Sequence, residues 1–196
     1  MRATFRDTEN EMKVKCSVYI AASVDGFIAK PGGDIDWLER PEYAAAEMNG
    51  LRYEQFISTV DAIVMGRHSF EKVLSFSGWP YEGTPVIVLS SKAVAVPDRV
   101  KDKVRILAGS PEQVVSQLAS EGKKHLYIDG GITIQRFLEA KLIDEITITR
   151  IPILLGSGIP LFASNGAEQP LRLIEAVASP NGFVQERYAV RSRAQP

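Results

Sequence analysis

The chain has 196 residues, and 23 Lys and Arg against 24 Asp and Glu give it a net charge of −1 at pH 7. This length predicts one domain, and 45% hydrophobic residues are typical of a globular protein with a core. The balanced charge excludes a broad basic surface, so we expect a small-molecule partner rather than a nucleic acid.

Cysteine and histidine are scarce, which restricts the chemistry. Cys16 is the only cysteine, and His68 and His125 are the only histidines. One cysteine forms no disulfide within the chain, and these three side chains lack the spacing of a metal site, so we expect no metal. We find neither a run of 18 apolar residues nor the apolar region of a signal peptide. We therefore expect a cytoplasmic protein with no membrane partner.

Short apolar runs alternate with helical patterns, which predicts an α/β fold with a mainly parallel sheet covered on both faces. Residues 1–13 are expected to form an irregular extension before a single domain of residues 14–196. The first strand is expected at residues 14–22, followed by a helix at 43–59. The last strands lack a long helix between them, so we expect an antiparallel edge. The remaining strands are expected at residues 62–65, 86–89, 104–108, 125–129, 144–151 and 183–190, and the remaining helices at 70–74, 111–120 and 133–140.

The helix at residues 111–120 has the best-defined start. Ser110 suits the capping position, Pro111 suits the first helical position, and Gln113 completes a capping box. Gly122 then marks its end.

Small and polar residues follow most of the expected strands. Ligands bind beyond the carboxyl ends of strands in open α/β sheets, so we expect these residues along one rim. Glycines let a backbone approach a phosphate, helix starts offer free N–H groups, and Arg67 and Lys92 add cations. Three such ends suit a dinucleotide with an extra 2′-phosphate; the alternative is that both cations are solvated surface residues. The strand ends read Gly66-Arg67-His68-Ser69, Ser90-Ser91-Lys92, Gly109-Ser110 and Gly130-Gly131.

The chain has neither the GxGxxG pattern of a Rossmann fold nor the GxxxxGK[ST] pattern of a P-loop. Instead, residues 21–29 (AASVDGFIA), 64–71 (VMGRHSFE), 88–91 (VLSS) and 128–131 (IDGG) occur in the order seen in the dihydrofolate-reductase-like superfamily. The first of these segments and the stretch 131–162 resemble more closely the reductase domain of bifunctional riboflavin-biosynthesis deaminase/reductases. This resemblance covers about residues 14–190.

The resemblance implies a dihydrofolate-reductase-like three-layer fold, with a central mixed, mostly parallel sheet of about eight strands flanked by helices. It also implies NADPH bound across the rim. The chain has no room for a deaminase domain, so we expect a stand-alone reductase. The residues that match the family's cofactor-binding positions are Ala22, Ile28, Gly66, Arg67, His68, Ser69, Ser90, Ser91, Lys92, Gly109, Gly130, Gly131, Ile132 and Thr133.

Acidic residues after the first strand are the candidates for the acceptor side. In dihydrofolate reductases an acid lies a few residues after a Trp, and Glu42 is the best match, followed by Asp36 and Asp25. Asp34 and Trp37 are the candidate substrate-binding residues. A carboxylate beside an aromatic ring can hold a pterin-like ring and help protonate it. The alternatives are that Glu42 stabilises a helix N-terminus and that Trp37 packs in the core.

The leading hypothesis is an NADPH-dependent reductase of a pterin- or pyrimidine-like heterocycle, similar to 5-amino-6-(5-phosphoribosylamino)uracil reductase, that works by direct hydride transfer. The alternatives are dihydrofolate reductase activity and a non-catalytic nucleotide-binding or dimeric scaffold protein. A homodimer is expected, with the apolar stretch 146–155 as its interface.

Overall fold

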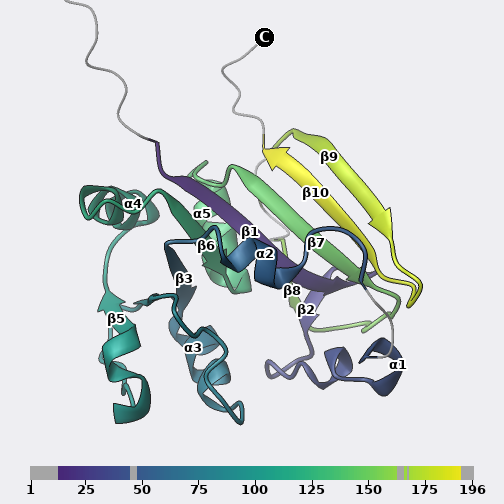
Figure 1. Cartoon of the computed structure of the whole chain (residues 1–196), viewed down its shortest axis with the longest axis horizontal. Coiled ribbons are helices and arrows are strands. Elements are labelled where there is room, and N and C mark those ends of the chain that lie inside the picture. The colour runs from purple at the N-terminus through teal and green to yellow at the C-terminus, as the bar shows by residue number, and fades with distance from the viewer. Residues whose placement is uncertain (1–12, 45–47, 163–165, 167, 191–196) are drawn as a thin grey trace, which may run out of the picture.

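The computed structural model describes residues 13–44, 48–162, 166 and 168–190. An eight-stranded sheet with the order β5-β4-β3-β6-β1-β7-β10-β9 forms its centre (Figure 1). The strands of this sheet are β1 (Lys15–Ser23), β3 (Ala62–Gly66), β4 (Val86–Leu89), β5 (Val104–Leu107), β6 (His125–Asp129), β7 (Glu145–Ile151), β9 (Leu171–Ala178) and β10 (Val184–Val190). A separate two-stranded sheet pairs β2 (Phe27–Ala29) with β8 (Ile159–Pro160).

The six strands from β5 to β7 run parallel to one another, and β10 runs antiparallel to both β7 and β9. This confirms the mixed, mostly parallel sheet with an antiparallel edge. Parallel neighbours need crossover connections, and the helices of this chain supply them. The edge needs only the short turn between β9 and β10.

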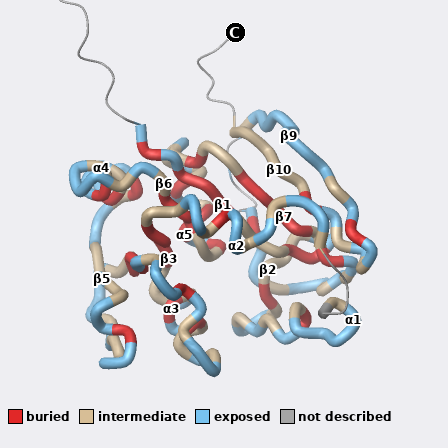
Figure 2. Tube along the Cα trace, viewed as in Figure 1, coloured by how far each residue is buried: buried red, intermediate tan, exposed pale blue. Residues whose placement is uncertain are grey.

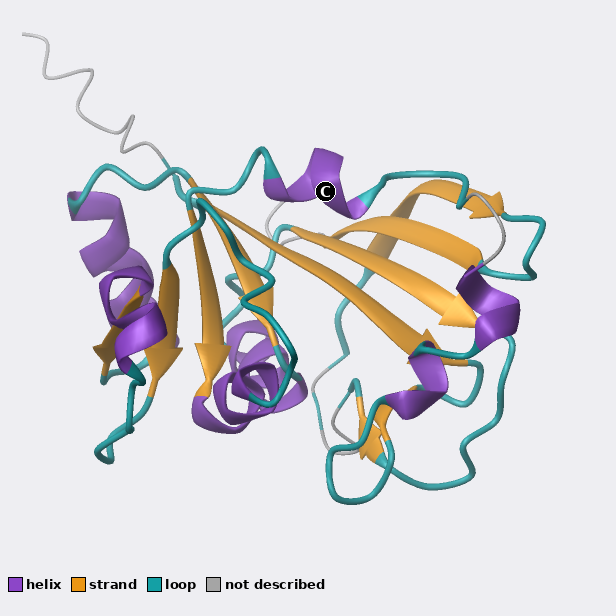
Figure 3. Ribbon diagram, turned by 60° about the horizontal axis from the view of Figure 1, so that its bottom comes forward, coloured by secondary structure: helices purple, strands orange, loops and turns teal. Residues whose placement is uncertain are grey.

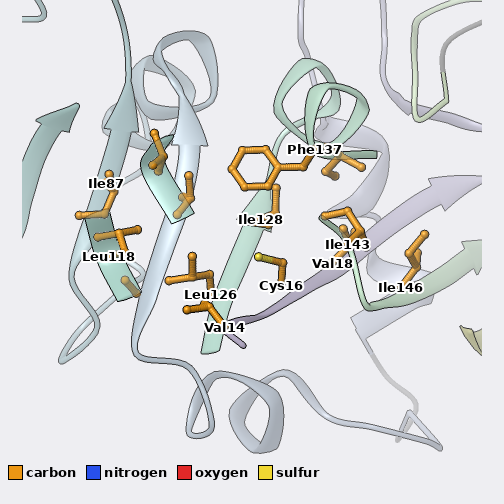
Figure 4. Close-up of a cluster of buried hydrophobic side chains, with 14 of the residues drawn as sticks. Val14, Cys16, Val18, Ile87, Leu118, Leu126, Ile128, Phe137, Ile143 and Ile146 are labelled. Atoms are coloured by element: carbon orange, nitrogen blue, oxygen red, sulfur yellow. The ribbon is translucent and has the colours of Figure 1, made fainter. Parts of the chain in front are cut away.

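Helices cover both faces of the sheet and complete three layers (Figure 3). Helices α4 (Pro111–Ser120) and α5 (Gly131–Glu139) pack on one face, against a cluster that includes Cys16 and Ile128 (Figure 4). Helices α2 (Tyr53–Ile57) and α3 (Arg67–Leu74) pack on the other face, against a second cluster. Because successive strand residues face opposite sides, the central strands are buried over most of their length (Figure 2).

The start of α4 confirms the predicted capping box. The hydroxyl of Ser110 accepts a hydrogen bond from the backbone N–H of Gln113 at 3.3 Å. In return the side chain of Gln113 accepts from the N–H of Ser110 at 2.9 Å. Local chemistry therefore determined this boundary without help from tertiary packing.

Strands β1 and β6 pair over only three residues and then separate. Their register runs from Lys15 opposite His125 to Ser17 opposite Tyr127, after which β1 pairs with β7 alone. The Tyr127 hydroxyl donates to the carbonyl of Tyr19 at 2.8 Å, which satisfies a group that has lost its ladder partner. The sheet is therefore open beyond Tyr127, at the carboxyl end of β6.

The prediction of a single helix at residues 43–59 is wrong. The structure has α1 (Pro41–Ala44) and α2 instead, and Gly50 between them has a φ of +89° that no α-helix allows. Residues 45–47 lie outside the described part. Strand β9 was not predicted, because its sequence does not alternate between apolar and polar residues. Most of the expected extension 1–13 also lies outside the described residues.

The stretch expected to form a dimer interface is partly buried and partly exposed. In β7, Ile146, Ile148 and Ile151 are each at most 2% exposed, whereas Leu154 in the following loop is 72% exposed. Exposed apolar side chains of the sheet lie on β9, at Leu171, Leu173 and Ile174, and on β10, at Val184. The homodimer itself stays a prediction. Among the described residues, no helix is long and apolar enough to cross a membrane.

His125 is held as a neutral ring at the start of β6. Its Nδ1 lies 2.9 Å from the carbonyl oxygen of Thr59, which can only accept, so Nδ1 carries the proton. Its Nε2 lies 2.8 Å from the hydroxyl of Ser17 and accepts from it. Burial lowers the pKa of His125 below its usual value, and the nearby Lys15 adds to this, against opposing effects of Thr59, Glu145 and Asp61.

We predict that His125 makes the free energy of unfolding fall as the pH drops below about 6.5. In that range the unfolded chain binds a proton that the folded ring resists, so acid favours unfolding. Urea unfolding between pH 5 and 8 measures this slope. The variant His125→Gln is expected to be less stable at pH 8 by about 1–2 kcal/mol, with a flatter pH dependence. An unchanged slope in this variant would contradict the prediction.

Candidate active site

A cleft of about 1010 Å³ lies along the carboxyl ends of β1, β3, β4, β5 and β6. This is where an open α/β sheet is expected to bind its ligand. The cleft brings together all but one of the predicted cofactor-binding residues. They are Ile28, Gly66, Arg67, His68, Ser69, Ser90, Ser91, Lys92, Gly109, Gly130, Gly131, Ile132 and Thr133.

Two helix N-termini meet in this cleft. Helix α3 starts after Gly66, and α5 starts after Gly130, and both glycines line the cleft. A Cβ atom on Gly66 would lie 3.0 Å from the hydroxyl of Thr133 in α5, so the two helix starts are close neighbours. The free N–H groups and the positive ends of the two helix dipoles favour bound anions between them.

Gly130 and Gly131 are required by the packing of this corner. Gly130 has a φ of +85°, and a Cβ there would collide with the hydroxyl of Ser69 in α3. A Cβ on Gly131 would lie 2.9 Å from Ile28 and 3.4 Å from the carbonyl of Pro160. The diglycine therefore lets α5, α3 and β2 approach one another closely.

Cations border the same part of the cleft. Arg67 pairs with Glu71 at 3.6 Å, while Lys92 and Arg136 have no acid within 4.0 Å among the residues that the structure describes. Ser90 shapes the turn that carries Lys92, because its hydroxyl accepts from the N–H of Lys92 at 3.1 Å. Hydroxyls, cations and helix N-termini at one end form the donor set that suits the phosphates of a dinucleotide.

Asp129 is a half-buried acid in the lining of the cleft, and the sequence reasoning missed it. It follows Tyr127 by two residues on β6, so both face the side of the sheet that α3 covers. The Tyr127 hydroxyl lies 3.2 Å from Oδ1 of Asp129 and 2.8 Å from the carbonyl of Tyr19. One hydroxyl proton serves one acceptor at a time. When it serves Tyr19, a proton on Asp129 lets this carboxyl donate to Tyr127.

The surroundings of Asp129 favour its neutral form. Burial raises the pKa of Asp129, against the hydrogen bonds from the Gly130 N–H and Tyr127. Burial and the Asp129 charge together raise the pKa of Tyr53 to about 12, and they also raise the pKa of Tyr81. These phenols therefore stay protonated and uncharged. A carboxylate at Asp129 would have no positive charge from them to compensate its own.

Three of the predicted acids lie on the surface outside the cleft lining. Glu42 lies 3.7 Å from Arg40, and its side chain is 60% exposed. Asp36 pairs with Lys30 at 2.7 Å, and the hydrogen bond from Lys30 lowers the pKa of this carboxyl. Asp34 lies 3.5 Å from Lys72. The loop that carries these acids contributes other residues to the cleft: Gly32, Gly33, Ile35 and Leu38.

Asp25 connects two loops and does not line the cleft. Its carboxylate accepts from the Ser23 hydroxyl at 2.6 Å and from the N–H groups of Leu155 and Gly156 at 3.1 and 2.7 Å. These bonds, the one from Ser23 first, lower the pKa of Asp25. The carboxylate therefore stays charged and joins the turn after β1 to the loop after β7.

Ala22 and Trp37 are buried away from the cleft. Ala22 is fully buried and faces the α5 side of the sheet, while its neighbour Ala21 lines the cleft. Trp37 is 1% exposed, with Ile35 and Leu38 beside it in the lining. The alternation of side chains along a strand explains the one-residue difference at Ala22. Among the described residues, no three His, Cys, Asp or Glu side chains come together as ligands for a metal ion.

The sheet, the cleft at its carboxyl edge and the paired helix starts define a protein of the dihydrofolate-reductase-like fold class. Residues 15–185 match the family model of the RibD C-terminal domain, and the chain belongs to this family. The Bacillus subtilis (strain 168) protein YwjB, itself uncharacterized, is 36% identical over 165 residues, which cover 83% of this chain and 90% of YwjB.

Solved structures show the same fold. A protein from Shewanella sp. PV-4, provisionally assigned to riboflavin biosynthesis, is 38% identical with a TM-score of 0.82, over 91% of this chain and all of that one. The Thermotoga maritima diaminohydroxyphosphoribosylaminopyrimidine deaminase/5-amino-6-(5-phosphoribosylamino)uracil reductase is 15% identical with a TM-score of 0.67, over 91% of this chain and 57% of that protein. Enterococcus faecalis dihydrofolate reductase, in complex with NADP(H), is 18% identical with a TM-score of 0.59, over 92% and 98% of the two chains.

We predict that Gly130→Ala destabilises the protein by about 2–3 kcal/mol, because it adds backbone strain and a collision with Ser69. Urea unfolding measures the loss. Gly122→Ala is the matched control, since Gly122 has a φ of +83° and open space around its Cβ position. The control is expected to lose about 1 kcal/mol. An equal loss in both variants would show that the contact with Ser69 is unimportant.

Proposed function

We propose that this chain is an NADPH-dependent reductase of a pterin- or pyrimidine-like heterocycle. The observation that carries the proposal is Asp129, a half-buried acid that faces the same cleft as two helix N-termini and a group of cations. Membership of the RibD C-terminal domain family supports an oxidoreductase acting on a heterocycle. The dihydrofolate reductase of the same fold class is known in complex with NADP(H), which supports the choice of cofactor.

The phosphates of the cofactor would bind at the end of the cleft bordered by α3, β4 and β5. The N–H groups at the start of α5 would face the pyrophosphate, with Gly130 and Gly131 allowing close approach. Arg67, Ser90 and Lys92 would hold the 2′-phosphate, since a guanidinium binds phosphate oxygens in pairs. Ile28 and Ala21 would then flank the nicotinamide near Asp129.

Reduction of a carbon–nitrogen double bond needs a hydride at carbon and a proton at nitrogen. NADPH supplies the hydride when it is bound. A protonated Asp129 would give its proton to the nitrogen of that double bond, and Tyr127 keeps the carboxyl in place. Burial against the apolar walls of the cleft raises the pKa of Asp129, which favours the protonated form that this step requires.

Dihydrofolate reductase activity has less support. That alternative depended on an acid at Glu42 facing the nicotinamide end, and Glu42 lies on the surface beside Arg40. A non-catalytic nucleotide-binding role would require the same cofactor end but would have no use for an acid of raised pKa at Asp129. The two roles differ in whether Asp129 affects turnover.

We predict that Arg67→Ala raises the Kd for NADPH about tenfold to a hundredfold and leaves the Kd for NADH unchanged. The lost interaction involves only the 2′-phosphate. Fluorescence titration of both nucleotides measures the two constants. Arg172→Ala, at an exposed arginine of β9, is the matched control and is expected to change neither. Equal losses for both nucleotides would exclude Arg67 from the 2′-phosphate, and no NADPH binding to the unaltered chain at tens of micromolar would overturn the proposed function.

We predict that Asp129→Asn lowers kcat by about a hundredfold or more while the Kd for NADPH stays within about twofold. The amide keeps the shape of the side chain but has no proton to give. In the unaltered enzyme kcat is expected to fall as the pH rises through the raised pKa of Asp129, because deprotonation removes the acid. That decline is expected to be absent in the variant.

Oxidation of NADPH at 340 nm, with 5-amino-6-(ribosylamino)uracil and its 5′-phosphate as acceptors, measures these rates. Glu42→Gln is the control and is expected to retain full activity, since Glu42 lies outside the cleft. Full activity of Asp129→Asn would show that another group supplies the proton.

A further inference from the structure

We propose that Tyr81 is a specificity-determining residue of the acceptor site, and that its hydroxyl donates a hydrogen bond to a carbonyl oxygen of the acceptor ring. This inference rests on the proposed reductase function and concerns the end of the cleft next to Asp129. Tyr81 lies in the loop between α3 and β4, and it lines the cleft together with Val73 and Phe76. It lies outside all the segments that carry the family resemblance.

The Tyr81 hydroxyl differs from those of the tyrosines around it. The hydrophobic cluster under α2 and α3 contains Tyr19, Tyr53, Tyr81 and Tyr127. Two of these hydroxyls donate within the protein, Tyr19 to the carbonyl of Leu51 at 2.9 Å and Tyr127 to that of Tyr19 at 2.8 Å. The hydroxyl of Tyr53 is enclosed and has no partner among the described residues. The Tyr81 hydroxyl forms no hydrogen bond with a described residue either, but it is not enclosed, so its proton is available to a ligand in the cleft.

The position of Tyr81 is fixed by its ring and by its backbone. The ring packs edge-to-face against Trp79, with centroids 5.5 Å apart and planes at 88°, and the residue is only 9% exposed. Its carbonyl accepts from the N–H of Thr84 at 3.3 Å, which closes a tight turn. Within this turn Glu82 pairs with Lys103 at 2.8 Å. A donor held in this way loses little conformational entropy when a ligand binds, as a binding residue requires.

The chemistry of this phenol indicates the ligand atom that it would bind. Burial raises the pKa of Tyr81, and the charge of Asp129 raises it further, so the phenol keeps its proton and acts as a donor. A carbonyl oxygen has two accepting lone pairs, and pterin- and pyrimidine-like rings carry such oxygens. Tyr81 and Asp129 lie on the same face of the sheet. The acceptor ring would therefore meet one donor for its carbonyl oxygen and one acid for its nitrogen.

Packing does not require the hydroxyl of Tyr81. The neighbouring wall residues Val73 and Phe76 are apolar, and a phenylalanine at position 81 would fill the same space as the tyrosine ring. Removal of a hydroxyl that has no partner in the protein leaves no other group unpaired, so it costs no stability. A site that hydrogen-bonds its substrate, in contrast, loses discrimination when that bond is removed. Stability and acceptor binding are therefore expected to respond differently to the same substitution.

Steady-state kinetics of Tyr81→Phe, with 5-amino-6-(5-phosphoribosylamino)uracil as the acceptor and saturating NADPH, test this proposal. We expect the KM for the acceptor to rise about tenfold while kcat stays within about threefold, because the hydrogen bond is present both before and during hydride transfer. The Kd for NADPH, from fluorescence titration, is expected to stay within about twofold, since the cofactor binds elsewhere in the cleft. The free energy of unfolding in urea is expected not to fall.

Tyr53→Phe is the matched control. Burial and the charge of Asp129 also raise the pKa of Tyr53, but its side chain does not line the cleft. An effect transmitted through Asp129 would appear in both variants, whereas a direct contact changes the KM of Tyr81→Phe alone. An unchanged KM in Tyr81→Phe, or an equal rise in both variants, would overturn the proposal, as would NADPH binding by the unaltered chain without turnover of this acceptor. Failure to bind NADPH at all would overturn the proposed function instead.

Discussion

The separation of β1 from β6 is the feature on which the rest of the structure depends. The two strands share a register over only Lys15 to Ser17, and beyond it β1 follows β7 alone. The backbone groups released by this separation need new partners, and the Tyr127 hydroxyl supplies one to the carbonyl of Tyr19. The opening creates the cleft and leaves Asp129 at its inner wall. A fully paired sheet would have no room for a ligand between these strands.

The cleft shows how burial and charge assign different roles to similar side chains. Asp25 accepts three hydrogen bonds and stays ionised, so it serves as a tie between loops. Asp129 is half-buried among phenols, and burial raises the pKa of its carboxyl, so it suits a role as an acid. Both are aspartates next to a glycine in the sequence. Their surroundings, and not their motifs, separate the structural residue from the candidate catalytic one.

The same principle divides the cleft along its length. Helix starts and glycines need to be close together to hold phosphates, and the contacts of Gly66 with Thr133 and of Gly130 with Ser69 bring α3 and α5 to that distance. At the other end the loop at residues 30–42 pairs its acids with the nearby lysines.

Most of the fold and the glycine-rich end of the cleft follow from the sequence, because both depend on local signals. Apolar runs of strand length, the capping box at Ser110 and the glycines after the strands each act within a few residues. The position of the acid in the cleft does not follow from the sequence. The three predicted acids, Glu42, Asp36 and Asp25, lie close to an aromatic residue in the sequence. The sequence does not show the ion pairs and hydrogen bonds that they form in the folded chain. Asp129 precedes the diglycine Gly130-Gly131, in a segment that the resemblance already included. It faces the cleft because β1 and β6, whose paired residues are 110 positions apart in the sequence, separate beyond Tyr127. Sequence determines which strands and turns form, and tertiary structure decides which carboxyl is buried, because burial depends on groups that meet only in the folded chain.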